Sequence, residues 1–265
     1  MEFCTIASGS SGNCTFIGTQ HENLLVDAGI SGKRIEEGLA KAGRKGNELD
    51  AILLTHEHID HIRSIGVLVR KFAVPVYATE GTIRELFNVS SMGKMDPSLF
   101  HTIRADEAFT IGETKIEPFR IMHDAAEPVG YRLENGGSRM AVATDMGCYN
   151  DYIVDHLKDL DGMVIEANHD INMLQVGPYP YPLKIRIMGE NGHLSNLHCG
   201  RLLCEILHEH LRQIVLGHLS KENNYEALAY ATVTSEITMG DNPYRGDELP
   251  ITVASRSECS QLYSI

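Results

Sequence analysis

The chain has 265 residues, with 43% hydrophobic and 22% charged side chains and a formal net charge of −13. These values are typical of a globular protein, and we expect one large α/β domain spanning residues 1–265. The excess of acid argues against a surface built for nonspecific nucleic-acid binding, which Lys and Arg supply, and no apolar run is long enough to cross a bilayer.

The amino terminus, MEFCTI, has an early acid and no basic flank followed by an apolar stretch, so it lacks the pattern of a secretory signal. The six cysteines form no C-x-x-C pair, which argues against a disulfide framework and against a zinc ribbon. We therefore expect a cytoplasmic protein with reduced thiols and no membrane contact. The sequence does not indicate an oligomeric state.

Short apolar or alternating runs predict strands at 3–6, 14–17, 24–26, 51–54, 76–78, 108–111, 129–133, 140–144, 162–165, 214–216 and 251–253. Helical spacing predicts helices at 33–42, 61–72, 80–88, 150–158, 196–211 and 223–239, with Asn196 as the N-cap of the fifth. The segment 175–182, rich in Gly, Pro and Tyr, is predicted to be a rigid surface loop. Consecutive strands followed by dispersed helices favour two sheets covered by helices over a doubly wound sheet.

Residues 55–61 have the sequence THEHIDH and follow a predicted strand directly. His56 and His58 are two residues apart, so in extended backbone their side chains point the same way. Asp60 and His61 come where the chain turns into a helix, so they point elsewhere. Imidazole and carboxylate suit Zn²⁺, Mn²⁺ or Fe²⁺, and two such ions about 3.5 to 4 Å apart form a hydrolytic clamp. The heptapeptide therefore predicts two pairs of metal ligands.

Three further residues directly follow apolar runs and are candidates to complete these pairs: His123, Asp145 and His218. A lone histidine in such a place is more often a hydrogen-bonded structural residue. The HxHxDH motif reverses that expectation here, because its two pairs need partners from elsewhere in the chain.

The order of HxHxDH, a distant His, an Asp after a strand and a final His resembles the metallo-β-lactamase superfamily. That fold is a four-layer αββα sandwich of the α/β class, with a dinuclear site at the sheet edges. Within the superfamily, the segments SGSSGNCT, LLVDAG, HDAAEPVGY, EANHD, GPYPYPLKIRI and GHLSN resemble the YycJ/WalJ group of bacterial nucleases. The likeness covers nearly the whole chain.

The resemblance implies two divalent metal ions, Zn²⁺ or Mn²⁺ with Fe²⁺ as a further option, and a metal-bridging hydroxide as the nucleophile. It implies that one aspartate bridges the two ions and that each ion has three further ligands. The implied ligands are His56, His58 and His123 for the first metal, Asp60, His61 and His218 for the second, and Asp145 for both.

The tripeptide His-Leu-Ser occurs twice, beginning at His193 and at His218. We assign metal binding to His218, which follows a predicted strand. His193 is then the expected general acid, oriented by Glu166, as in ribonuclease Z, which this arrangement resembles. The alternative is that His193 only packs against or caps the next helix. The residues expected to act in catalysis are therefore His193, Glu166 and Asp60, the last of which is also an implied metal ligand.

Asp27 is expected to accept a hydrogen bond that fixes the HxHxDH loop, rather than to bind metal. The SGSSGN segment, with Ser10 and Asn13, is a candidate phosphate-binding loop, although a tight turn between two strands explains it equally well. Lys184 and Arg186 alternate with isoleucines, so we expect them to share one strand face and to contact the phosphate backbone. An ordinary solvated face explains this pair as well.

The YycJ/WalJ resemblance implies a phosphodiesterase that acts as a 5′ to 3′ exonuclease, on DNA rather than RNA, with a part in DNA repair. A small-molecule phosphodiesterase is the alternative, because HDAAEPVGY also resembles the cyclic-phosphate hydrolases of phosphonate metabolism. A non-catalytic metal-binding protein is a third reading. Asp145 stands where several lactamases have cysteine, and His58 where diiron oxidoreductases have glutamate, so lactam opening and redox chemistry are disfavoured.

Overall fold

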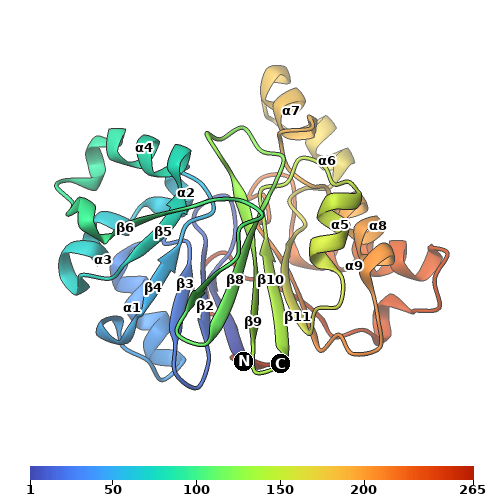
Figure 1. Cartoon of the computed structure of the whole chain (residues 1–265). Helices are drawn as coiled ribbons and strands as arrows, with labels where there is room; N and C mark the ends of the chain where they lie inside the picture. Colours follow the sequence, from blue (N-terminus) through green and yellow to red (C-terminus); the bar gives the residue numbers. More distant parts are fainter.

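Two seven-stranded sheets lie face to face in the computed structural model, which describes residues 1–265 (Figure 1). The first has the order β14-β1-β2-β3-β4-β5-β6, with bounds β1 Glu2–Ala7, β2 Cys14–Gly18, β3 Asn23–Val26, β4 Ala51–Leu53, β5 Val76–Thr79, β6 Phe100–Ile103 and β14 Tyr263–Ser264. The second has the order β13-β12-β11-β10-β9-β8-β7, with bounds β7 Phe109–Ile111, β8 Thr114–Arg120, β9 Val129–Asn135, β10 Ser138–Ala143, β11 Gly162–Glu166, β12 Gln213–Gly217 and β13 Ile251–Val253.

Helices cover the outer face of each sheet (Figure 1). On the side of the first sheet are α1 Gly32–Lys41, α2 Ile59–Ile62, α3 Ile65–Phe72 and α4 Glu80–Asn88. On the side of the second are α5 Asp151–Leu157, α6 Ile171–Val176, α7 Tyr181–Met188, α8 Asn196–Ile206 and α9 Glu226–Met239. Single 3-10 turns are η1 Gly46–Glu48, η2 Ser90–Met92, η3 Pro97–Leu99 and η4 Gly246–Glu248. None of the helices has both the length and the apolar composition that crossing a bilayer requires.

Side-chain alternation along the strands builds three apolar layers. In β3, Leu24 and Val26 pack between the two sheets, whereas Leu25 packs under the helices of the first sheet. In β10, Met140 packs between the sheets and Ala141 faces the helices of the second sheet. Successive residues of a strand point to opposite faces, so each sheet is apolar on both sides. The predicted four-layer αββα sandwich is therefore confirmed.

Three of the expectations about local structure are wrong. The predicted helix 61–72 is two helices, because the chain bends between α2 and α3. Ser195, not Asn196, caps α8, since its side chain accepts a hydrogen bond from the backbone N–H of His198. Lys184 and Arg186 lie on α7 and not on a strand; Pro182 falls in the first turn of that helix, where proline is favoured. Strands β6, β8 and β14 and helices α6 and α7 were not predicted. The predicted loop 175–182 is shorter than expected, because its ends belong to α6 and α7.

Candidate metal centre and active site

The chemistry-bearing residues lie where strands of both sheets end. Glu166 is the last residue of β11, and Asp145 and His218 follow β10 and β12 within two residues. These three strands are parallel, so their carboxyl ends meet at one edge of the second sheet. The HxHxDH segment follows β4 of the first sheet, and the N–H of Val129 donates to the carbonyl of Thr55 (3.0 Å), which joins the two edges.

Three polar residues at strand ends have left-handed backbone. Asp27, Asp145 and His218 have φ angles of 63°, 62° and 55°. For residues other than glycine this conformation costs about 1–3 kcal/mol each, and such residues are enriched at functional sites. The strands thus end abruptly, and each of these side chains contacts other polar groups of the site.

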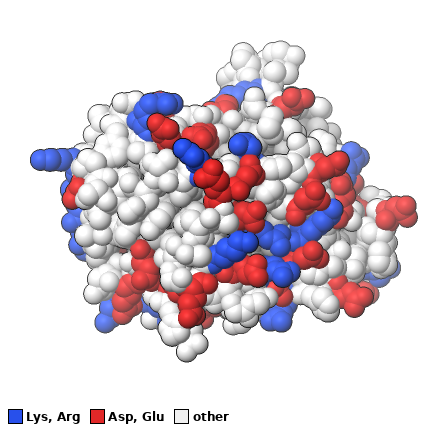
Figure 2. Space-filling model, in the orientation of Figure 1, with Lys and Arg blue, Asp and Glu red and all other residues white.

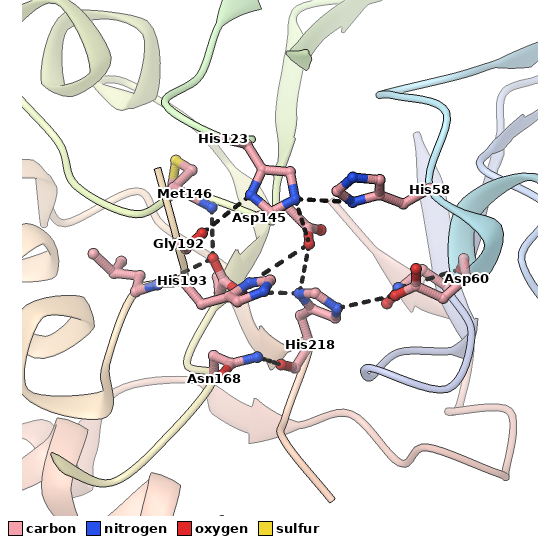
Figure 3. Close-up of polar contacts among 12 residues, drawn as sticks. His58, Asp60, His123, Asp145, Met146, Asn168, Gly192, His193 and His218 are labelled. Carbon is pink, nitrogen blue, oxygen red and sulfur yellow. Dashed lines mark hydrogen bonds and ion pairs between the residues drawn. The ribbon is translucent and has the colours of Figure 1, made fainter. Parts of the chain in front are cut away.

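The first group of donor atoms comes from His56, His58 and His123, whose ligand atoms all lie within 4.8 Å of one another. His123 Nε2 is 3.2 Å from His58 Nδ1 (Figure 3). His123 Nδ1 lies 3.1 Å from the carbonyl of Gly192, which can only accept, so Nδ1 carries the hydrogen and Nε2 keeps its lone pair. His123 therefore presents Nε2 as an acceptor to this group.

The second group comes from Asp60, His61 and His218, also within 4.8 Å. Asp60 Oδ2 is 3.6 Å from Nε2 of both histidines. Each imidazole is held at its other nitrogen, because His61 Nδ1 lies 2.7 Å from Asp27 and His218 Nδ1 lies 3.0 Å from Glu166. Both rings are thus fixed with Nε2 directed at Asp60.

Asp145 lies between the two groups (Figure 3). Its Oδ2 is 3.2 Å from His61 Nε2, and its Oδ1 is 3.6 Å from His123 Nε2. It also forms a donor set with His56 and His61. The carboxylate therefore has one oxygen near each group, as a bridging ligand requires.

Three atoms of this cluster are buried without a hydrogen-bond partner: His56 Nε2, Asp145 Oδ2 and His218 Nε2. Buried polar atoms nearly always have a partner, so three orphans in one cluster need a cause. Imidazole nitrogen and carboxylate oxygen are the donors that Zn²⁺, Mn²⁺ and Fe²⁺ accept. The residues present fit divalent cations.

Burial and mutual charge shift the titration of the cluster. Burial lowers the pKa of His56 well below its usual value. Burial alone would favour the neutral form of Asp145, but the imidazoles of His218 and His61 hold its pKa well below the usual range. Burial likewise opposes charge on His218, yet the carboxylates around it, Asp145 foremost, raise its pKa to about 10. Without cations the site therefore holds protons on imidazoles that face ionised carboxylates.

Beside the cluster, His193 and Glu166 form a pair. His193 Nδ1 is 2.8 Å from Glu166 Oε1 (Figure 3). The other carboxylate oxygen accepts the N–H groups of Met146 (2.6 Å) and Leu194 (3.2 Å), so Glu166, fully buried, is fixed on both sides. Its burial favours the neutral acid, but His193 and His218 lower its pKa. The Nε2 of His193 makes no hydrogen bond within the chain, and its side chain is 19% exposed.

The two His-Leu-Ser histidines differ in their neighbours. His218 forms one donor set with Asp60 and His61, and a second with Asp145, Glu166 and His193. His193 belongs only to the second set. This geometry favours His218 over His193 as the histidine that completes the second group of donor atoms.

The four residues expected to contact substrate do not lie together on one surface. Ser10 is exposed on the loop between β1 and β2, but Asn13 is buried and its amide contacts Gly9 N–H (2.9 Å) and His61 Nε2 (3.0 Å). Asn13 therefore acts inside the protein, beside a ligand atom. Arg186 pairs with Asp124, and Lys184 donates to the carbonyl of Gln175.

Sequence reasoning missed several residues that position the site. Thr55 donates its N–H to Asp27 (2.9 Å), and its hydroxyl lies 3.0 Å from His56 Nδ1. Asn168 donates to the carbonyl of His218 (2.8 Å). A Cβ at Gly29 would lie 1.6 Å from the carbonyl oxygen of Asp60, so only glycine lets these segments touch. Thr55, Gly29 and Asn168 all lie within motifs quoted above, THEHIDH, LLVDAG and EANHD, but nothing in those motifs indicates which groups these residues contact.

A family model described as the beta-lactamase superfamily domain matches residues 22–219, which include every donor named above. The chain belongs to this superfamily. Among solved structures of that fold, Zn²⁺-bound PqqB from Methylobacterium extorquens superposes with a TM-score of 0.73 at 17% identity, covering 98% of this chain and 100% of PqqB. At this identity the likeness speaks for the fold alone.

Within the superfamily, two curated relatives are similar over most of their length. Exodeoxyribonuclease WalJ of Streptococcus pneumoniae serotype 2 (strain D39) is 41% identical over 240 residues, covering 91% of this chain and 89% of WalJ. Exodeoxyribonuclease YycJ of Bacillus anthracis is 37% identical over 234 residues, covering 88% of each. The chain therefore belongs to the WalJ/YycJ group of the beta-lactamase superfamily, and the predicted resemblance is confirmed.

Proposed function

We propose that residues 1–265 form one metal-dependent hydrolase domain that degrades DNA from its 5′ end, a 5′ to 3′ exodeoxyribonuclease. The observation that carries the proposal is the 41% identity with the exodeoxyribonuclease WalJ over 91% of the chain. A cluster of five histidines and two aspartates at the sheet edges, with three orphaned buried donors, supports metal-dependent hydrolysis. Nucleic acid, DNA before RNA, is the proposed substrate, and DNA repair is the proposed setting.

Two divalent cations, Zn²⁺ or Mn²⁺, are the proposed cofactors. The proposed ligands are His56, His58 and His123 for one ion, Asp60, His61 and His218 for the other, and Asp145 for both. Such ions polarise phosphoryl oxygens and lower the pKa of a water from about 15.7 toward 7. Asp27 and Glu166 hold His61 and His218 from behind, a support that typically changes metal affinity by about 10- to 100-fold.

His193 is the proposed general acid. With Nδ1–H donated to Glu166, the proton that His193 gives to the leaving oxygen of the phosphodiester comes from Nε2. The carboxylate of Glu166 stabilises the imidazolium before transfer and fixes the ring. The carboxylate of Asp60, beside His61 and His218, contributes negative charge that balances the proposed cations.

Digestion of end-labelled nucleic acids tests this function. DNA and RNA of one sequence, labelled at the 5′ or the 3′ end, are incubated with the protein and Zn²⁺ or Mn²⁺, with and without chelator. We expect immediate release of labelled mononucleotide from 5′-labelled DNA and stepwise shortening of 3′-labelled DNA, both abolished by chelator. Turnover confined to cyclic phosphates would indicate a small-molecule phosphodiesterase, and bound metal without any turnover would indicate a binding protein.

A further inference from the structure

Helices α6 and α7, with the segment that joins them, form an arm that stands out from the body near the top of Figure 1. We use the word arm for residues 171–189. No residue of α7 is buried, although the helix consists largely of apolar side chains. A helix with this many apolar side chains and none of them buried is unusual in a globular protein. The arm therefore has a surface without a partner.

One face of α7 carries that surface. Tyr181, Ile185 and Met188 are spaced i, i+4, i+7, so they line one face of the helix, and they are 74%, 48% and 39% exposed. Leu183 and Ile187 lie on the opposite face and are half-buried, so that face packs toward the body. The outward stripe is thus not the side that holds the arm in place.

The arm differs from the rest of the chain in its charge. The protein has 36 acidic residues and a net charge of −13, yet residues 171–189 include no Asp or Glu and carry Lys184 and Arg186. In Figure 2 the outer end of the protrusion shows neither acidic nor basic side chains, whereas charges of both signs crowd the face below it. A polyanion meets less repulsion here than on most of the surface.

Direct contacts join the arm to the candidate active site. Arg186 pairs with Asp124, the residue after His123. The N–H of His193 donates to the carbonyl of Ile187 (2.9 Å), at the end of α7. The arm is therefore continuous with the loop that holds the proposed general acid, and a strand lying on it would lead into the site.

We propose that the arm is a binding platform for a single-stranded stretch of the DNA substrate, with a base stacked on Tyr181 and the neighbouring phosphate at the ammonium of Lys184; this inference rests on the proposed function. Exposed aromatic rings beside cations are what sequence-independent single-strand binding uses. A second copy of the chain fits less well, because a stable dimer buries about 800 Å² per partner and the stripe offers only a few side chains.

The chain has no tryptophan, so Tyr181→Trp creates a single fluorescent reporter on the arm. The metal-loaded variant is titrated with a phosphorothioate oligothymidylate, which resists hydrolysis. We expect quenching that saturates with the oligonucleotide, because a stacked base quenches indole. Met239→Trp, at the far end of α9 where Met239 is 70% exposed, is the control and should not respond. An unresponsive Tyr181→Trp would overturn the inference. Emission that changes with protein concentration before DNA is added would assign the stripe to a second copy instead.

Kinetics supply a second readout. One stacked base contributes about 1–3 kcal/mol, so Tyr181→Ala should raise the KM for single-stranded DNA on the order of five- to 150-fold. Tyr181→Phe keeps the ring and should restore the KM, and Met239→Ala should leave it unchanged. An unaltered KM in Tyr181→Ala overturns the platform while the proposed function stands. Failure of the unmodified protein to degrade DNA at all would overturn the function itself.

Discussion

Nδ1 of His193 lies 2.8 Å from Oε1 of Glu166, and the same carboxylate oxygen lies 3.0 Å from Nδ1 of His218. One buried acid thus orients both the proposed general acid and a proposed metal ligand. A change at His193 should therefore affect turnover alone, whereas a change at Glu166 should affect both turnover and metal binding.

His193→Ala should reduce kcat by about 10²- to 10⁴-fold, the usual contribution of a general acid, while both metals stay bound. Steady-state kinetics on DNA and elemental analysis of the same preparation measure the two effects. His210→Ala, on the exposed surface, is the matched control. Loss of metal from His193→Ala would show that the roles of His193 and His218 are exchanged.

Glu166→Gln should lower both turnover and metal affinity. The amide keeps the size of the side chain but removes the charge opposite two imidazoles, so turnover should fall together with metal affinity, the latter by about 10- to 100-fold. Competition with a chelator of known affinity gives the second number. A variant that loses turnover but binds metal as tightly as the unmodified protein would show that Glu166 supports His193 alone.

Metal binding should release protons. The pKa of His218 is raised to about 10, so its ring is protonated at neutral pH in the metal-free protein. Burial opposes charge on His61, but the carboxylates of Asp145 and Asp27 raise its pKa in the same direction. A ligand imidazole must give up its proton, so apparent metal affinity should increase with pH. Calorimetric titration of the metal-free protein in buffers of different ionisation enthalpy counts the protons released. Affinity that is flat between about pH 6 and 8 would contradict the assignment.

Tyr131→Phe should destabilise the junction of the two sheets. The hydroxyl of Tyr131, on β9 of the second sheet, donates to the carbonyl of Leu54 (2.6 Å), just before the HxHxDH segment, and the ring is fully buried. Its loss removes the hydrogen bond to a buried carbonyl, which typically costs about 1–3 kcal/mol of unfolding free energy. Urea unfolding of metal-free protein measures the change. Tyr225→Phe, with Tyr225 54% exposed, is the control and should be neutral.

The metal cluster was predictable because four of its donors lie within one heptapeptide and the other three directly follow apolar runs. His123, Asp145 and His218 stand out in the sequence once HxHxDH demands partners, and the structure brings all three to it. The contact between His193 and Glu166 joins positions 27 apart, so only the resemblance suggested it.

Other features depend on tertiary packing that sequence patterns do not encode. The alternation around Lys184 and Arg186 spans only four residues, too few to tell a strand from a helix, and Pro182 gave the better signal. Asn13 was expected to face substrate from a polar loop, but the fold buries it against His61. Backbone hydrogen bonds hold Asn13 inward: its N–H donates to the carbonyl of Asp60 (2.8 Å), and its carbonyl accepts from the N–H of Gly29 (2.8 Å).

Five histidines and two aspartates from both sheets are proposed to hold two neighbouring cations. Anomalous diffraction from crystals grown with Mn²⁺ tests this arrangement most directly. We predict two peaks about 3.5 to 4 Å apart, one beside His56, His58 and His123 and one beside Asp60, His61 and His218. A single peak, or peaks away from these side chains, would contradict the account.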